Sequence, residues 1–224
     1  MINKLDIHYA VKGNPFEYKE VDDSARTIDL VANTYLYFDS DYDVLVPGCA
    51  KKSIKERGPN SSEAGKIKHL KGHDLSEMIA VPTMVSEEKV NGNDVLRCNS
   101  YFPESEDSEN ELINYKAGMY DQHSIGFRYL NIQLADKKSA NEDNRKLWDE
   151  FIQKIINPKD AEKVGFMYIV KEIALYEYST VAFGANRLTP YLGSKSENKQ
   201  VRYNNIEMKL DTLLKSDVEK YIKD

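Results

Sequence analysis

Residues 166–183 read FMYIVKEIALYEYSTVAF and form the densest β pattern of the chain. β-Branched and aromatic residues dominate this stretch, and such side chains pack well on a pleated surface. Gly184 to Asn186 follow it with residues that are typical of turns and so end the pattern. The segment therefore predicts strand structure in the second half of the chain.

Shorter β patterns precede this segment and are separated by turn-forming residues. They occur at residues 27–38, 44–46, 65–70, 78–85, 95–102 and 124–130. Many short strands with few helices predict an α+β domain built on a β-barrel or a sandwich.

Helical patterns are fewer and lie between or after the strands. Residues 49–57 predict a short helix that Gly58-Pro59 ends. Residues 135–163 are charged and poor in β-formers, and they predict an inserted amphipathic helix that ends before Pro158. The apolar face of that helix consists of Leu147, Trp148, Phe151, Ile152 and Ile155.

The C-terminal part differs in composition from the rest. Residues 193–201 are rich in Ser, Lys and Asn and predict a linker, and an apolar stripe from Ile206 to Tyr221 predicts a further amphipathic helix. We therefore expect one domain over residues 1–192, followed by a linker and helix over 193–224. That helix packs on its own domain or docks on a partner, and the pattern leaves both open.

Composition excludes several classes of function. Of the 224 residues, 41% are hydrophobic and 30% charged, which fits one large globular domain. The net charge of −6 argues against a nucleic-acid surface, because phosphate binding needs clustered basic residues. No apolar run approaches the roughly 20 residues of a membrane span, and the N-terminus has no signal-peptide pattern. We expect neither nucleic acid nor membrane as a partner.

Cysteine and histidine usage points to a chain without a metal or disulfide framework. Cys49 and Cys98 have no zinc-ligand spacing, and four His residues complete no ligand cluster. The plain interpretation is a reducing cytoplasm and no cofactor. Cys49 has no local histidine and is expected to be a buried hydrophobe rather than a nucleophile.

The acidic turn after the first β pattern invites a calcium interpretation. Asp39, Asp41 and Asp43 alternate as at the start of an EF-hand loop, but the position that needs a glutamate holds Ala50. We therefore expect a solvated loop.

Three segments offer the members of a nucleophile, base and orienter set. They contain His73, Ser124 and Glu172. A serine hydroxyl becomes a nucleophile when an imidazole takes its proton, and a third group fixes the tautomer of that imidazole. Gly126 beside Ser124 gives a substrate backbone room to approach. Backbone N–H groups are the default oxyanion donors, with Arg128 as the alternative.

Two of these roles have competitors. His69 shares a segment with His73 and is the second choice for the base, whereas His123 precedes Ser124 and should face the opposite side of its strand. Glu177 is the second choice for the orienting carboxylate. In a regular strand its offset of five residues puts it on the face opposite to Glu172.

Four blocks of sequence together resemble the tailed-phage prohead protease family. Residues 38–54 combine an acidic turn, a Val-rich strand, Pro-Gly and a short helix, and residues 67–80 resemble the catalytic-histidine segment, with Ala80 in place of the usual glycine. Residues 117–128 resemble the nucleophile segment with its Ser-x-Gly-Phe, and residues 172–186 resemble the closing block, with Gly184 where proline is common.

The resemblance covers roughly residues 27–192 and implies a serine endopeptidase. It implies that Ser124 is the nucleophile, His73 the general base and Glu172 the orienting carboxylate. The family's fold is similar to that of the herpesvirus assembly protease, in which the third triad member precedes a Val-x-Leu strand, and this favours Glu172 over Glu177. The implied fold is a closed or nearly closed β-barrel of short, mostly antiparallel strands ringed by several helices.

The resemblance also implies partners and a location. The substrates would be the phage major capsid protein and the scaffold protein, cleaved inside the assembling prohead in the bacterial cytoplasm. Self-cleavage in the 193–201 linker and a homodimer follow by analogy. The alternative is a non-catalytic scaffold or interaction module in capsid assembly, against which the three filled chemical positions argue.

Overall fold

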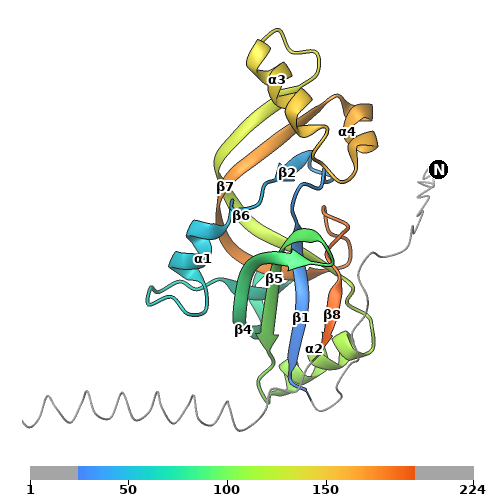
Figure 1. Ribbon diagram of the computed structural model, residues 1–224. Coiled ribbons are helices and arrows are strands. Elements are labelled where there is room, and N and C mark those ends of the chain that lie inside the picture. Colours follow the sequence, from blue (N-terminus) through green and yellow to red (C-terminus); the bar gives the residue numbers. More distant parts are fainter. Residues whose placement is uncertain (1–24, 195–224) are drawn as a thin grey trace, which may run out of the picture.

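The structure is a computed structural model and describes residues 25–194 (Figure 1). Its strands are β1 (Thr27–Thr34), β2 (Asp43–Leu45), β3 (Lys68–Lys71), β4 (Asp74–Val90), β5 (Asn93–Tyr101), β6 (Gln122–Asp136), β7 (Phe166–Val181) and β8 (Tyr191–Ser194). Its helices are α1 (Lys51–Arg57), α2 (Glu106–Lys116), α3 (Glu142–Phe151) and α4 (Pro158–Val164).

All eight strands belong to one mixed sheet with the order β2-β7-β3-β4-β5-β1-β8, and β6 also pairs with β7. β2 and β3 run parallel to β7, whereas the other ladders are antiparallel. The densest β pattern of the sequence, residues 166–183, thus contains the 16-residue strand β7, with which β2, β3 and β6 all pair.

The expected barrel is wrong, because the sheet is open. Closure needs a ladder between the outermost strands. Within residues 25–194, β6 pairs with β7 alone and β8 with β1 alone. Figure 1 shows the reason: the long β6–β7 hairpin bends away from β1, β4, β5 and β8 and carries α3 and α4 at its far end. The α+β composition is confirmed, but four helices at the periphery do not ring a barrel.

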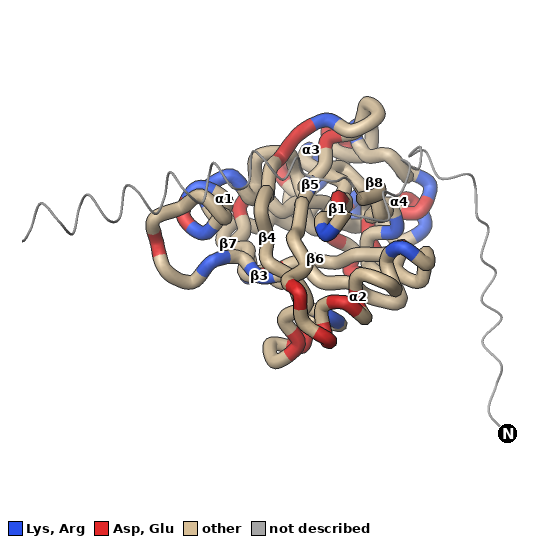
Figure 2. The backbone as a smooth tube through the Cα atoms, turned by 90° about the horizontal axis from the view of Figure 1, so that it is seen from below, with Lys and Arg blue, Asp and Glu red and all other residues tan. Residues whose placement is uncertain are grey.

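The main core lies between β1, β5, β7 and the neighbouring helices. Its largest fully buried side chains include three tyrosines, which a sheet interior accommodates when their hydroxyls find partners. They are Tyr35, Tyr115 and Tyr178. At the outer side of this core, α2 begins at Ser105, whose hydroxyl accepts the N–H of Ser108. Acidic residues follow in its first turn, where the helix dipole favours them (Figure 2).

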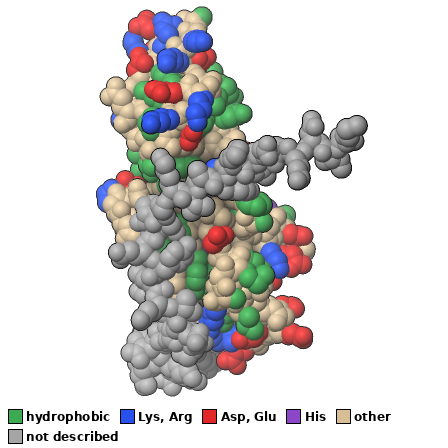
Figure 3. All heavy atoms as spheres, turned by 90° about the vertical axis from the view of Figure 1, so that its right-hand side faces the viewer, with side chains coloured by type: hydrophobic (Ala, Val, Ile, Leu, Met, Phe, Trp, Pro, Cys, Tyr) green, Lys and Arg blue, Asp and Glu red, His purple; other side chains and the backbone are tan. Residues whose placement is uncertain are grey.

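A second, smaller core holds the inserted segment. The inserted segment forms two short helices where the sequence predicted one. α3 ends at Phe151, before Pro158 as expected, and Pro158 is the first residue of α4. Proline suits a first helical position, where its missing N–H has no partner to lose. Trp148, Phe151 and Ile155 from the predicted apolar face pack here against β6 and β7 side chains. Over this end of the molecule, charged and apolar side chains alternate on the surface (Figure 3).

The last strand runs slightly past the expected domain end at residue 192. Leu192 is followed by Gly193 and Ser194 inside β8, which pairs with β1, so the sheet continues two residues past the expected boundary. The helix predicted over 206–222 and most of its linker lie outside the described residues. None of the helices within 25–194 is long and apolar enough to cross a membrane.

We expect Trp148→Ala to lower the free energy of unfolding by about 3–5 kcal/mol, because it removes the largest buried side chain of the second core. Ile156→Ala is the matched control: this neighbouring side chain is 44% exposed, and its loss should change stability by less than about 0.5 kcal/mol. Urea unfolding monitored by far-UV circular dichroism, which does not rely on the Trp148 signal, gives the free energy of unfolding of both variants. Equal effects would contradict a packed second core.

Candidate active site

His73 lies at the tip of the β3–β4 hairpin. Lys71 pairs with Asp74, so Gly72 and His73 form a two-residue loop. Both have left-handed backbone angles, with φ of 60° and 63°, as a type I′ turn requires. Histidine is among the residues that tolerate this conformation, and Gly72 supplies the other left-handed position without strain. The tight turn therefore holds the imidazole at a defined place beside the sheet.

The register between β6 and β7 places the other site residues. Ser124 pairs with Ser179, and Gly126 pairs with Glu177. Side chains of directly opposed residues in antiparallel strands share one face of the sheet, with their Cα atoms about 4.5–5.5 Å apart. Ser124, Ser179 and Glu177 thus lie on one face, the same face that the His73 turn reaches.

His73 and Glu177 are joined by a direct hydrogen bond. The Nδ1 atom of His73 lies 2.7 Å from Oε1 of Glu177, whose side chain is 6% exposed. A carboxylate can only accept, so Nδ1 carries the proton and Nε2 remains free to accept one. This is the arrangement in which an orienting carboxylate prepares an imidazole to act as a base.

The Ser179 hydroxyl forms a second hydrogen-bonded link between His73 and Glu177. It donates to Oε2 of Glu177 at 2.6 Å and accepts the backbone N–H of His73 at 3.1 Å. The hydroxyl is fully buried and committed to these partners, so it is unsuited to attack a substrate. Ser124, opposite Ser179 on β6, is only partly buried. No hydrogen bond joins Ser124 to His73 within residues 25–194; such bonds often tighten only when substrate binds.

The charge of Glu177 favours the protonated imidazole. The hydrogen bond to Glu177 raises the pKa of His73 above its usual value, and partial burial opposes this only in part. A raised pKa makes His73 a stronger base for the hydroxyl proton of a nucleophile.

Gly126 has a different role from the one that its sequence position suggests. A Cβ atom on Gly126 would lie 1.9 Å from Oε1 of Glu177, far inside contact distance. The missing side chain therefore makes room for the carboxylate that holds His73, rather than for the backbone of a substrate.

Glu172, the first choice for the orienting carboxylate, does not reach His73. It lies opposite Asn131 and forms an exposed ion pair with Lys52 at 3.8 Å. Five residues of strand separate it from Glu177, about 16 Å along β7. The argument from alternation also fails, because the pairing skips Tyr176: Gly126 pairs with Glu177 and Phe127 with Leu175, so β7 is irregular between the two glutamates.

The competing histidines are structural. His69 and His123 are fully buried and share Tyr115, whose hydroxyl lies 3.2 Å and 3.1 Å from their Nε2 atoms. Burial lowers the pKa of His123 to about 4 and that of His69 well below its usual value. Both imidazoles therefore remain neutral and enclosed, away from any substrate.

The remaining candidates lie outside the hydrogen-bonded set. Arg128 is exposed, and no hydrogen bond within residues 25–194 connects it to Ser124. Cys49 and Cys98 are free and buried, and burial raises the pKa of both thiols. The described residues contain no cluster of three or more His, Cys, Asp or Glu that could hold a metal ion.

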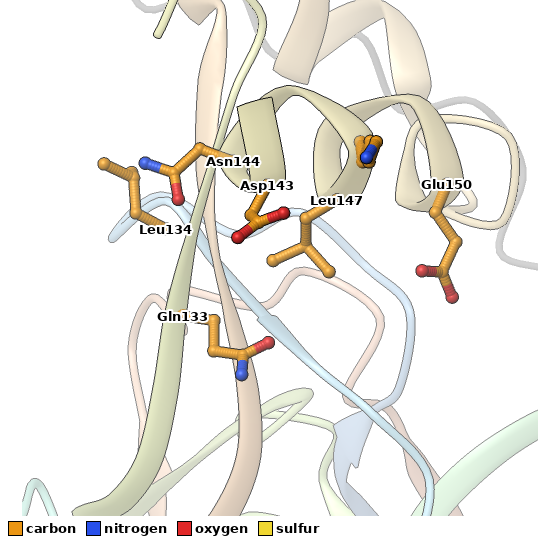
Figure 4. A pocket seen from close by; sticks show the side chains of 7 residues that line it. Gln133, Leu134, Asp143, Asn144, Leu147 and Glu150 are labelled. Carbon is orange, nitrogen blue, oxygen red and sulfur yellow. The ribbon is translucent and has the colours of Figure 1, made fainter. Parts of the chain in front are cut away.

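A cavity of about 240 Å³ adjoins the nucleophile candidate. Ser124, Gly126 and Phe127 of β6 line it, together with the acidic turn at residues 39–43. The tip of that turn, residues 40–42, is exposed as expected from sequence, but Asp43 at its end belongs to β2 and is only 3% exposed. A larger hollow of about 440 Å³ lies between β6 and α3 (Figure 4). Its lining contains no serine, cysteine or histidine, so it offers neither a nucleophile nor an imidazole.

Comparisons with models of known protein families, with curated proteins and with solved structures find no match to this chain. The resemblance to prohead proteases therefore stays a prediction from the four sequence blocks. The evidence on function that the structure adds is the geometry around His73, Glu177 and Ser124.

We expect Glu177→Gln to lower the pKa of His73, because the neutral amide no longer stabilises the imidazolium. Glu172→Gln is the matched control and should leave that pKa unchanged. Two-dimensional NMR of the imidazole nitrogens, recorded from pH 5 to 9, measures the titration of each histidine. A shift with Glu172→Gln and none with Glu177→Gln would contradict the described pairing.

Gly126→Ala should act on the same titration from the opposite strand. The new methyl group displaces the Glu177 carboxylate, so the pKa of His73 should fall toward its usual value while the fold is retained. The measurement is again NMR titration of His73, with circular dichroism as the check on folding. An unchanged pKa in a folded variant would show that the carboxylate does not depend on the space at Gly126.

Proposed function

We propose that this chain is a serine endopeptidase that processes capsid and scaffold proteins during phage head maturation. The observation that carries the peptidase part is the His73–Glu177 hydrogen bond on the sheet face that Ser124 shares. The four sequence blocks that resemble prohead proteases support the proposed role in phage head maturation. A closed barrel is not needed for the peptidase part, since a triad is defined by geometry and roles rather than by fold.

In the proposed reaction, the Oγ atom of Ser124 attacks the scissile carbonyl carbon while Nε2 of His73 takes the hydroxyl proton. Glu177 stabilises the imidazolium and holds its orientation through Nδ1. The tetrahedral intermediate collapses, His73 passes the proton to the leaving amine, and an acyl-enzyme ester remains on Ser124. Water then attacks the ester, His73 takes its proton, and Ser124 leaves with that proton restored.

Glu177 thus takes the role that sequence reasoning assigned first to Glu172. Ser179 is a positioning residue, because it holds Glu177 and the His73 backbone without contacting a substrate. The major capsid protein and scaffold remain the proposed substrates, and the prohead inside the bacterial cytoplasm is the proposed site of action. A homodimer and self-cleavage within 193–201 belong to the same proposal by analogy.

The test is co-expression of the chain with the cognate capsid precursor, followed by mass spectrometry of the products. Wild type should trim the precursor, and Ser124→Ala and His73→Ala should abolish trimming. Glu177→Gln should reduce the rate by up to about 10⁴-fold, as expected when an orienting carboxylate is lost. Glu172→Gln should behave like wild type.

Each other result has a defined meaning. Trimming by Ser124→Ala at the wild-type rate would overturn the nucleophile assignment. Equal losses from Glu172→Gln and Glu177→Gln would overturn the choice of carboxylate. A wild-type chain that binds the precursor and leaves it intact would favour the non-catalytic assembly module.

A further inference from the structure

The cavity beside Ser124 is built from parts of the chain that are distant in sequence. One wall is the edge of β6 that carries Ser124 and Gly126, and β6 pairs with no strand on that side among the described residues. The opposite wall is the turn with Asp39, Asp41 and Asp43. Whatever occupies this cavity lies directly next to the proposed nucleophile.

The acidic wall has no cation to neutralise it. Asp39 uses Oδ1 to accept the N–H groups of Asp41 and Asp43, and Asp43 uses Oδ2 to accept the Tyr129 hydroxyl. None of the ion pairs within residues 25–194 involves these three carboxylates. The pKa of Asp39 is raised to about 7, chiefly by burial and further by the neighbouring carboxylates of Asp43 and Asp41, whereas its backbone hydrogen bonds oppose the shift.

A second polar group at the cavity also lacks a partner. Asn33 lines the cavity and is only 4% exposed. Its Oδ1 accepts a hydrogen bond from Asn186 at 3.0 Å, but its Nδ2 has no hydrogen-bond partner. A buried donor without an acceptor is costly, and a ligand carbonyl oxygen would satisfy it.

These groups call for a ligand that combines a cation with a carbonyl oxygen. A lysine or arginine residue within a peptide has both: its side chain complements the carboxylates and its backbone carbonyl can accept from Asn33. A metal ion fits less well, because it offers no acceptor to Nδ2 and the described acids form no metal-binding cluster.

We propose that the cavity between Ser124 and the Asp39–Asp43 turn is a substrate subsite that binds a lysine or arginine side chain close to the scissile bond. The subsite rests on the proposed peptidase function and specifies its substrate class. Pairing a buried carboxylate with a cation in place of a neutral side chain should favour basic substrates about 10- to 100-fold.

The first experiment measures cleavage by the full chain of fluorogenic peptides that carry the natural capsid cleavage sequence. At each position flanking the scissile bond, Lys or Arg is compared with Gln, Met and Glu. The proposal predicts that at one position Lys or Arg raises kcat/KM at least tenfold over Gln and Met, with Glu the poorest. A flat profile, or a preference for Glu at every position, would overturn it.

Variants of the Asp39–Asp43 turn test whether its carboxylates cause the preference for Lys or Arg. Asp43→Asn keeps an acceptor for Tyr129 but removes the buried charge, so it should lower the Lys-to-Gln ratio of kcat/KM about tenfold. Asp41→Asn removes an exposed charge from the same wall and should have a smaller effect in the same direction. Asp121→Asn is the control: Asp121 is exposed and close to Ser124 in sequence, but it does not line the cavity.

Binding separates this proposal from the peptidase proposal. The Ser124→Ala chain and its Asp43→Asn double variant are titrated with the fluorescently labelled Lys and Gln peptides, and anisotropy gives each Kd. If no peptide is cleaved by wild type but the Lys peptide binds Ser124→Ala more tightly, and Asp43→Asn removes that difference, the peptidase proposal fails and only a binding site for a basic side chain stands. If cleavage occurs with equal rates and equal Kd values for Lys and Gln, the subsite fails and the peptidase proposal stands.

Discussion

The pairing register of β6 and β7 is the constraint on which the proposed active site depends. It sets Ser124 opposite Ser179 and Gly126 opposite Glu177, so that one sheet face carries the hydroxyl, the carboxylate and the space that the carboxylate fills. Side chains alternate along a strand, and a slip of one residue would turn Ser124 to the other face. The His73 turn completes the site only because β3 runs beside the same stretch of β7.

The buried side of that stretch helps to hold the register. Tyr178 and Thr180 alternate with Glu177 and Ser179 on the other face of β7. Thr180 hydrogen-bonds His69 and Tyr115, Tyr115 reaches His123, and Ser100 connects Tyr178 to His69. A buried polar set is satisfied in one arrangement only, so it opposes slippage more specifically than apolar contacts do. The two faces of one strand segment thus divide the histidines: those on the inner face are neutral and structural, and the one at the outer face is charged more readily and accessible.

The buried carboxylates around the site differ in whether they have a cationic partner. Glu177 has its counterpart in His73, and its second oxygen is held by Ser179. Asp39 and Asp43 of the acidic turn accept hydrogen bonds but have no cationic partner among the described residues, although Asp43, at 3% exposed, is slightly more buried than Glu177, at 5%. Carboxylates in these two states suit different tasks: the paired one orients a base, and the unpaired ones attract a cationic group from outside the chain.

The sequence by itself predicted the strands up to β7, the short α1 helix before Gly58, and the candidates Ser124 and His73, but neither α4 nor β8. These follow from local properties: side-chain shape, turn residues, periodicity and the chemistry that each segment can offer. It also predicted Glu177, but only as second choice, although the Glu-x-Ser spacing of 177 and 179 is a signal that two polar groups share one strand face.

Tertiary structure alone decided three things. It left the sheet open rather than closed into a barrel, because the β6–β7 hairpin bends away from the other strands and β6 pairs with no second strand among residues 25–194. It placed Glu177, and not Glu172, against the His73 turn, because a register shift in β7 breaks the regular alternation between the two residues. It made the acidic turn part of a cavity, because Asp43 pairs into β2 against β7 and meets Tyr129 from β6. All three depend on which strands become neighbours, and strand neighbours are chosen by long-range pairing that no local pattern records.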